Sequence, residues 1–151
     1  MTLSFRYKPV STPQPVFALG GRFSRPRPMI PVTLIVRGRT HLAMGLLDSG
    51  ADDTVFPDSV AATLGIDLSA ATAGTAEGIG GNPVPLRYVN LTLRIADNNG
   101  RREWPAVVAF APLPNQLPLL GFAGFLQYFT ACFHGDLEFV ELTVNALYPG
   151  S

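Results

Sequence analysis

The sequence has few of the residues from which metal and thiol sites are built. Its 151 residues include one cysteine, Cys132, and two histidines, His41 and His134. A single cysteine excludes an internal disulfide, and we expect a buried apolar thiol rather than a nucleophile. The histidines have no clustered cysteines or carboxylates at ligand spacing, so we expect no metal and no other cofactor.

The chain also lacks an excess of charge and a long apolar run. Eleven basic and eleven acidic side chains balance, which argues against nucleic acid or an acidic membrane surface as a partner. Prolines interrupt each apolar stretch before it reaches spanning length, and residues 1–6 lack the apolar run of a signal peptide. We therefore expect a cytoplasmic protein with no membrane partner.

Length and pattern favour one all-β domain with a substantial core. Nearly half of the residues are apolar, and from Pro31 onward short apolar segments alternate with turn residues. Two short helices are expected, one over 60–64 that Asp58 or Ser59 caps and Gly65 ends, and one around 122–128. Three hairpins are expected from the strands. Val32–Val36 and Thr40–Leu47 are joined by a turn at residues 37–39, Pro83–Ala96 and Arg102–Phe110 by a turn at residues 97–100, and Phe129–Phe133 and Leu137–Val144 close the domain.

The first 30 residues differ in composition from the rest. A strand is possible at Leu3–Tyr7, and a passage rich in proline, glycine and arginine follows it. Such a passage is either an extended arm that packs on something else or a mobile tail. The prediction divides the chain into an N-terminal extended arm, residues 1–30, and a domain of residues 31–151.

The stretch around Asp48 is the strongest candidate for a site. Leu46 and Leu47 end an apolar strand, so Asp48 lies where that strand runs into a tight Ser49-Gly50 turn. The Ser49 hydroxyl can fix the turn, Gly50 permits a close backbone approach, and Ala51 keeps the adjoining space small. An ordinary surface turn is the alternative for the triplet by itself.

Two further motifs follow along the chain. Gly78-Ile79-Gly80 suits a hairpin tip whose backbone approaches a ligand while the isoleucine covers it, although a plain glycine turn is the alternative. Leu119-Leu120-Gly121 is an apolar strand end. Trp104, on an expected strand between these motifs, is most simply a packing residue.

Together the three motifs resemble those of the retropepsins, the single-domain aspartic proteases of the retroviral type. The resemblance covers roughly residues 31–133, with the motifs in the family's order. It implies a closed β-barrel, with Gly78, Ile79 and Gly80 in a mobile flap. It also makes Leu117 and Leu119 candidates for the substrate-binding wall, for which core packing is the alternative.

The sequence contains no second Asp-Ser-Gly or Asp-Thr-Gly. Acid–base hydrolysis of a peptide bond needs one ionised and one protonated carboxyl group, which a single aspartate cannot supply. A two-fold homodimer brings the same residue from each subunit to one axis. The resemblance implies this arrangement, with the Ser49 side chains hydrogen-bonded across the axis.

The chain departs from the family's pattern near Asp52 and at both ends. In the family, the residue at Asp52 binds the substrate main chain and pairs with an arginine directly after the later Leu/Ile-Gly motif, where this sequence has Phe122. Arg87 or Arg39 could replace that arginine as the partner of Asp52. Asp53 is expected to be solvated. The longer ends favour dimerisation through the active-site loops over interleaved termini.

The sequence therefore predicts a homodimeric aspartic endopeptidase that cleaves extended, largely apolar segments of a polypeptide substrate. The alternative is a peptide-binding or dimerisation module with the same fold and little or no turnover. The predicted catalytic residues are Asp48, Ser49 and Gly50, and the predicted substrate-binding residues are Ala51, Asp52, Asp53, Gly78, Ile79, Gly80, Leu117 and Leu119.

Overall fold

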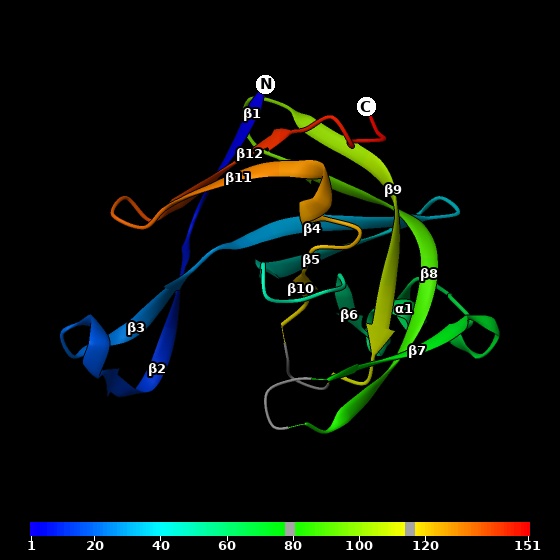
Figure 1. The fold of residues 1–151 in the computed structure, drawn as a ribbon, viewed down its shortest axis with the longest axis horizontal. Helices are drawn as coiled ribbons and strands as arrows, with labels where there is room; N and C mark the ends of the chain where they lie inside the picture. Colours follow the sequence, from blue (N-terminus) through cyan, green and yellow to red (C-terminus); the bar gives the residue numbers. More distant parts are fainter. Residues whose placement is uncertain (78–80, 114–116) are drawn as a thin grey trace.

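The computed structural model describes residues 1–77, 81–113 and 117–151. Within these ranges the chain is built almost entirely of strands, which confirms the all-β prediction (Figure 1). The strands are β1 (Thr2–Arg6), β2 (Lys8–Val16), β3 (Arg22–Arg27), β4 (Met29–Val36), β5 (Arg39–Leu47), β6 (Val55–Pro57), β7 (Thr72–Glu77), β8 (Pro83–Ala96), β9 (Arg101–Ala111), β10 (Leu119–Leu120), β11 (Phe129–His134) and β12 (Phe139–Val144). The helical segments are α1 (Asp58–Thr63) and three single 3₁₀ turns, η1 (Phe17–Leu19), η2 (Leu68–Ala70) and η3 (Leu126–Tyr128).

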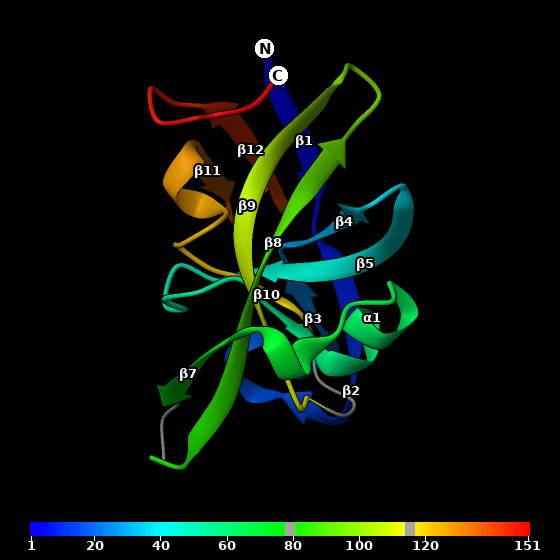
Figure 2. The ribbon, with the colours of Figure 1, turned by 90° about the vertical axis from the view of Figure 1, so that its right-hand side faces the viewer.

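The largest sheet has the strand order β4-β5-β10-β6-β9-β8-β7. It curls so that β4 also pairs with β8, where Thr33–Ile35 lies antiparallel to Thr92–Arg94. The predicted hairpins β4–β5 and β8–β9 are both present, and their turns fall at Arg37-Gly38 and at Asp97–Gly100. Figure 2 shows β8 and β9 crossing in front of the rest of this sheet.

The two ends of the chain meet in a second sheet, of order β1-β12-β11. The predicted closing hairpin is present as β11–β12, and β1, predicted at the chain start, pairs with β12 from Thr2↔Thr143 to Arg6↔Phe139. Residues 8–27 form a separate two-stranded hairpin, β2–β3, which extends away from the body in Figure 1. The division of the chain at residue 30 stays a prediction.

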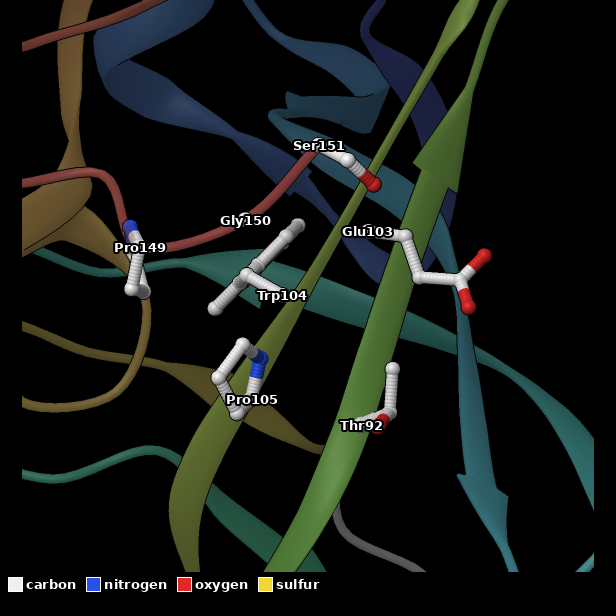
Figure 3. Close-up of a pocket in the computed structure, with 7 residues that line it drawn as sticks. All are labelled: Thr92, Glu103, Trp104, Pro105, Pro149, Gly150 and Ser151. Atoms are coloured by element: carbon white, nitrogen blue, oxygen red, sulfur yellow. The ribbon is translucent and has the colours of Figure 1, made fainter.

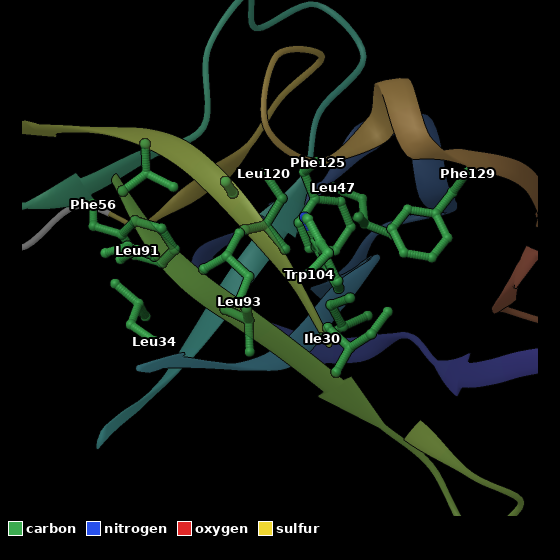
Figure 4. Close-up of a cluster of buried hydrophobic side chains, with 14 of the residues drawn as sticks. Ile30, Leu34, Leu47, Phe56, Leu91, Leu93, Trp104, Leu120, Phe125 and Phe129 are labelled. Atoms are coloured by element: carbon green, nitrogen blue, oxygen red, sulfur yellow. The ribbon is translucent and has the colours of Figure 1, made fainter. Parts of the chain in front are cut away.

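The core lies between the curled sheet and the β1-β12-β11 sheet, and Trp104 is at its centre (Figure 4). Trp104 is 1% exposed, and its indole N–H donates to Gly124 O at 3.0 Å. The Phe125 and Phe129 rings lie edge-on to the indole, with each ring centroid 5.2 Å away. A buried aromatic side chain stabilises a fold by about 2–3 kcal/mol, so the packing role predicted for Trp104 is confirmed.

The helix α1 ends as predicted but begins differently. Its first-turn N–H groups donate to no capping side chain, because the cap position is Pro57 and Asp58 already lies within the helix. At the other end, Gly65 adopts φ +69°, and the amides of Gly65 and Ile66 donate to Ala62 O and Ala61 O. Glycine adopts this left-handed conformation without the steric cost of a side chain.

Two other local predictions were wrong. Cys132 is exposed, because alternate residues of an edge strand face opposite sides and Phe129 and Ala131 occupy the core side of β11. The helix expected over 122–128 is only η3, because Gly124 adopts φ +86° and its N–H donates to the Gln127 side chain. In the described part of the chain, no helix has both the length and the apolar character needed to span a membrane.

Candidate active site

Asp48 follows β5 at the point where three strands meet. Leu46 and Leu47 pair in parallel with Leu119 and Leu120 of β10, and Leu119 also pairs with Val55 of β6. The Asp48 N–H continues the ladder by donating to Leu120 O at 3.1 Å. Two interior strands of the sheet therefore set the position of the Asp48 backbone.

Gly45 leaves room in β5 for the Leu120 side chain of β10. A Cβ atom on Gly45 would lie only 2.7–2.9 Å from three carbon atoms of the Leu120 side chain. Real Cβ contacts are not this short, so the buried Leu120 side chain occupies the space that a larger residue at 45 would need. Sequence reasoning placed Gly45 in the strand but gave no reason for a glycine there.

The Asp48 side chain closes its own turn. Its Oδ1 accepts a hydrogen bond from Gly50 N–H at 2.9 Å, and its main-chain oxygen accepts from Ala51 N–H at 3.1 Å. This is an Asx-type turn, which fixes the carboxylate relative to the backbone. Asp48 is half-buried, Ser49 and Gly50 are exposed, and among the described residues only Gly50 donates to the carboxylate.

The segment after β10 is hydrogen-bonded to the acidic loop, residues 48–54, which joins β5 to β6. Phe122 N–H donates to Ala51 O and Ala123 N–H donates to Asp52 O, at 2.9 and 2.8 Å. The buried Thr54 hydroxyl donates to Ala123 O at 2.8 Å. The two residues that follow Leu119-Leu120-Gly121 are thus hydrogen-bonded directly to the loop after Asp48.

Asp53 has a partner that sequence reasoning missed. Its Oδ2 accepts a hydrogen bond from the Tyr88 hydroxyl of β8 at 2.9 Å, so the prediction that Asp53 is solvated was wrong. Tyr88 belongs to a small apolar cluster built on Val55, Leu86, Ala109 and Ala111. The alternation of apolar residues along β8 could have placed Tyr88 on that face, but not opposite Asp53.

Asp52 is exposed, and neither arginine predicted as its partner pairs with it. Arg87 donates to Ala71 O at 3.0 Å, and the Arg39 guanidinium lies beside Gly65. Within residues 1–77, 81–113 and 117–151, no ion pair includes Asp52. Phe122, at the position of the family's arginine, is 59% exposed.

The remaining predicted residues are placed only in part. Gly78, Ile79 and Gly80 lie outside the described residues, between β7 and β8, which pair as far as Glu77↔Pro83. Leu117 and Leu119 are half-buried. Leu120 is in the core, so alternation along β10 directs Leu119 to the opposite side. The substrate-binding role of these two leucines stays a prediction, with core packing as its alternative.

The pocket drawn in Figure 3 is distant in sequence from Asp48. Its volume is about 380 Å³, and it is lined by Thr92, Glu103, Trp104, Pro105, Pro149, Gly150 and Ser151. The last residues of the chain form one wall, where the backbones of Glu103 and Ser151 exchange hydrogen bonds at 3.2 and 3.0 Å. None of the predicted site residues lines this pocket.

The Tyr88–Asp53 contact predicts an alkaline dependence of stability. The pKa of Tyr88 is raised, because burial disfavours the phenolate and the Asp53 carboxylate accepts from the hydroxyl and repels the ionised form. The Tyr88–Asp53 contact therefore stabilises the fold fully below about pH 10, the pKa of tyrosine in the unfolded chain. This stabilisation is lost as the pH rises through the higher pKa of Tyr88 in the folded protein. We expect Tyr88→Phe to lower the free energy of unfolding by about 1 kcal/mol at pH 8.

Urea unfolding at pH 8 and at pH 11 measures this effect. The difference between wild type and Tyr88→Phe should shrink at the higher pH. Tyr128→Phe is the matched control, since the Tyr128 hydroxyl makes no hydrogen bond within the described ranges. A difference that stays constant with pH would show that the lost hydroxyl, and not its ionisation, accounts for the effect.

Two comparisons with known proteins show the family and the fold of the chain. The model of the aspartyl protease family matches residues 32–122, more than half of the chain. The fold is similar to that in the crystal structure of a retropepsin-like aspartic protease from Rickettsia conorii, with a TM-score of 0.56 and 17% sequence identity over 94% of this chain and 90% of that one. No curated protein matched the sequence. The chain belongs to the aspartyl protease family and has a retropepsin-like fold.

Proposed function

We propose that the protein is an aspartic endopeptidase whose active site is completed by a second copy of the chain. The observation that carries this proposal is the Asp48 carboxylate, which two central strands and the Gly50 N–H hold in place while its side chain stays partly open to solvent. A carboxylate fixed in this way can activate a water molecule. The sequence contains one Asp-Ser-Gly triplet and no Asp-Thr-Gly, so the second carboxyl comes from a partner.

In the proposed dimer, the two Asp48 carboxyls share one proton, since ionising both at close range is unfavourable. The ionised group takes a proton from water as the water oxygen bonds to the substrate carbonyl carbon. The protonated group gives its proton to the carbonyl oxygen. Collapse of the resulting diol breaks the C–N bond as the leaving nitrogen takes the proton that the first carboxyl took from water. A diol hydroxyl gives its proton to the second carboxylate, which restores the shared proton.

Substrate binding would involve the loop after Asp48 and the β7–β8 hairpin. Ala51, Asp52 and Asp53 lie on that loop, and Asp53 is joined to β8 through Tyr88. We propose that an extended, largely apolar peptide lies between them and that the Gly78–Gly80 tip covers it. The closed barrel is likewise proposed, with the β4–β8 pairing as support.

The activity of each chain should fall on dilution, because only the dimer contains both carboxyls. At a total concentration tenfold below the dimer dissociation constant, roughly 15% of the chains remain dimeric, and specific activity should fall in proportion. Sedimentation equilibrium and initial rates on one peptide, over the same concentrations, measure both quantities. Full activity in a preparation that sediments as a monomer would contradict the shared carboxyl pair.

A diverse peptide pool tests the reaction itself. The full chain is incubated with the pool from acidic to neutral pH, with and without pepstatin, and new peptide ends are identified by mass spectrometry. We expect internal cuts that pepstatin suppresses and that Asp48→Asn protein does not produce. Peptides that are bound but left uncut at every pH would instead support the binding module.

A further inference from the structure

The β2–β3 hairpin forms a sheet of its own, and it pairs with neither of the other two sheets. Two aromatic side chains at its end are exposed, Phe17 at 98% and Phe23 at 60%. A two-stranded hairpin by itself is marginally stable in water, and a projecting aromatic patch marks an interaction surface. The hairpin therefore has the features of an arm that packs on another molecule.

Proline limits how the hairpin can make that contact. Pro9, Pro13 and Pro15 lie in β2, and Pro26 lies in β3. Proline has no N–H to donate, so these strands are poor edges for adding a further strand. A partner would bind the side-chain faces of the hairpin rather than extend its sheet.

One face of the hairpin is basic. Residues 8–27 contain four basic side chains and no acidic one. Lys8 pairs with Arg27 and Val10 with Arg25, so Lys8, Arg25 and Arg27 share a face. The fourth, Arg22, pairs at 3.3 Å with Glu138, in the turn before β12. Among the described residues no ion pair includes Lys8, Arg25 or Arg27.

The acidic loop after Asp48 has the opposite charge. Residues 48–54, between β5 and β6, contain three aspartates and no basic residue. Asp53 is bound by Tyr88, whereas Asp52 is exposed and has no ion-pair partner among the described residues. In Figure 1 the hairpin extends to the left of the body, and β5 runs toward the same side but ends within the body. If a second copy binds on this side of the body, the acidic loop of that copy lies within reach of the hairpin.

We propose, on the basis of the homodimer proposed above, that the β2–β3 hairpin is a dimerisation arm that packs across the active-site loop of a second copy of the chain. Arg25 faces Asp52 of that copy, and Phe17 packs against its surface. In a two-fold dimer each contact occurs twice. Dimer assembly then neutralises Asp52, which pairs with no arginine among the described residues of its own chain.

Charge reversal tests the pairing of Arg25 with Asp52. Sedimentation equilibrium on the full chain gives the dimer dissociation constant for wild type, Arg25→Glu, Asp52→Arg and the variant with both changes. Each single reversal should raise the constant about tenfold, and the double variant should return to within about threefold of wild type. Both side chains are exposed, so the fold should tolerate each change.

Phe17→Ser tests the tip of the arm. Phe17 is 98% exposed within one chain, so weakening of the dimer by this change reports a contact between chains. We expect a rise of about tenfold in the dissociation constant. Leu42→Ser and Arg101→Glu are matched controls at exposed positions on β5 and β9, and they should leave the constant unchanged.

The outcomes separate the arm from the proposed function. One result is a wild-type dimer that cleaves peptides while Arg25→Glu and Phe17→Ser have the wild-type dissociation constant. That result would overturn the arm and leave the protease proposal intact. Single reversals that weaken the dimer without recovery in the double variant would overturn the pairing of Arg25 with Asp52. Cleavage by a monomer would overturn the dimeric site and the arm together.

Discussion

Asp48→Asn is expected to lower the rate of peptide hydrolysis by at least ~1,000-fold and to leave the fold intact. The asparagine Oδ1 can still accept from Gly50 N–H at the position where the Asp48 Oδ1 does, so the turn is retained. An amide cannot take a proton from water, so the chemical step is lost. Initial rates on a peptide from the pool, together with circular dichroism and thermal unfolding, measure the two effects.

Mixing adds a further expected result for the same variant. Adding excess Asp48→Asn protein to a fixed amount of wild type should lower the measured activity, because mixed dimers contain only one Asp48 carboxyl. Asp136→Asn is the control, since Asp136 is exposed in the turn between β11 and β12. If folded Asp48→Asn protein cut the same bonds at the wild-type rate, Asp48 would have no part in the mechanism.

Gly121→Ala is expected to disturb both the fold and the site. A Cβ atom on Gly121 would lie 2.2 Å from Asp53 O and 2.6 Å from Ala51 O, and backbone atoms cannot move aside without shifting the acidic loop. We expect a loss of about 3 kcal/mol in the free energy of unfolding, and hence a Tm lower by roughly 6–12 °C. Displacing the loop by about 1 Å should lower activity about 100-fold.

Thermal unfolding and peptide cleavage at a temperature where the variant is folded separate these two effects. Gly135→Ala is the matched control, because a Cβ at Gly135 meets nothing within 4 Å and its backbone φ is not positive. Its stability should stay within about 0.5 kcal/mol of wild type. A Gly121→Ala protein as stable and active as this control would show that Gly121 does not hold the loop.

The sequence by itself determined the local elements of this protein. Alternating apolar residues predict which segments are strands, and turns such as Arg37-Gly38 predict the β4–β5 hairpin, because both depend on neighbours in the chain. The Asp48-Ser49-Gly50 turn is local in the same sense, since its hydrogen bond spans two residues. The family resemblance rested on such short motifs and their order.

Only the tertiary structure decided how distant segments meet. The pairing of Leu119-Leu120 with Leu46-Leu47, the Tyr88–Asp53 hydrogen bond and the contact of Gly121 with the acidic loop each join residues far apart in sequence. The exposure of Cys132 likewise depends on which face of β11 the core covers. Local preferences choose a strand and its alternation, whereas its partner and buried face depend on long-range packing that no single segment encodes.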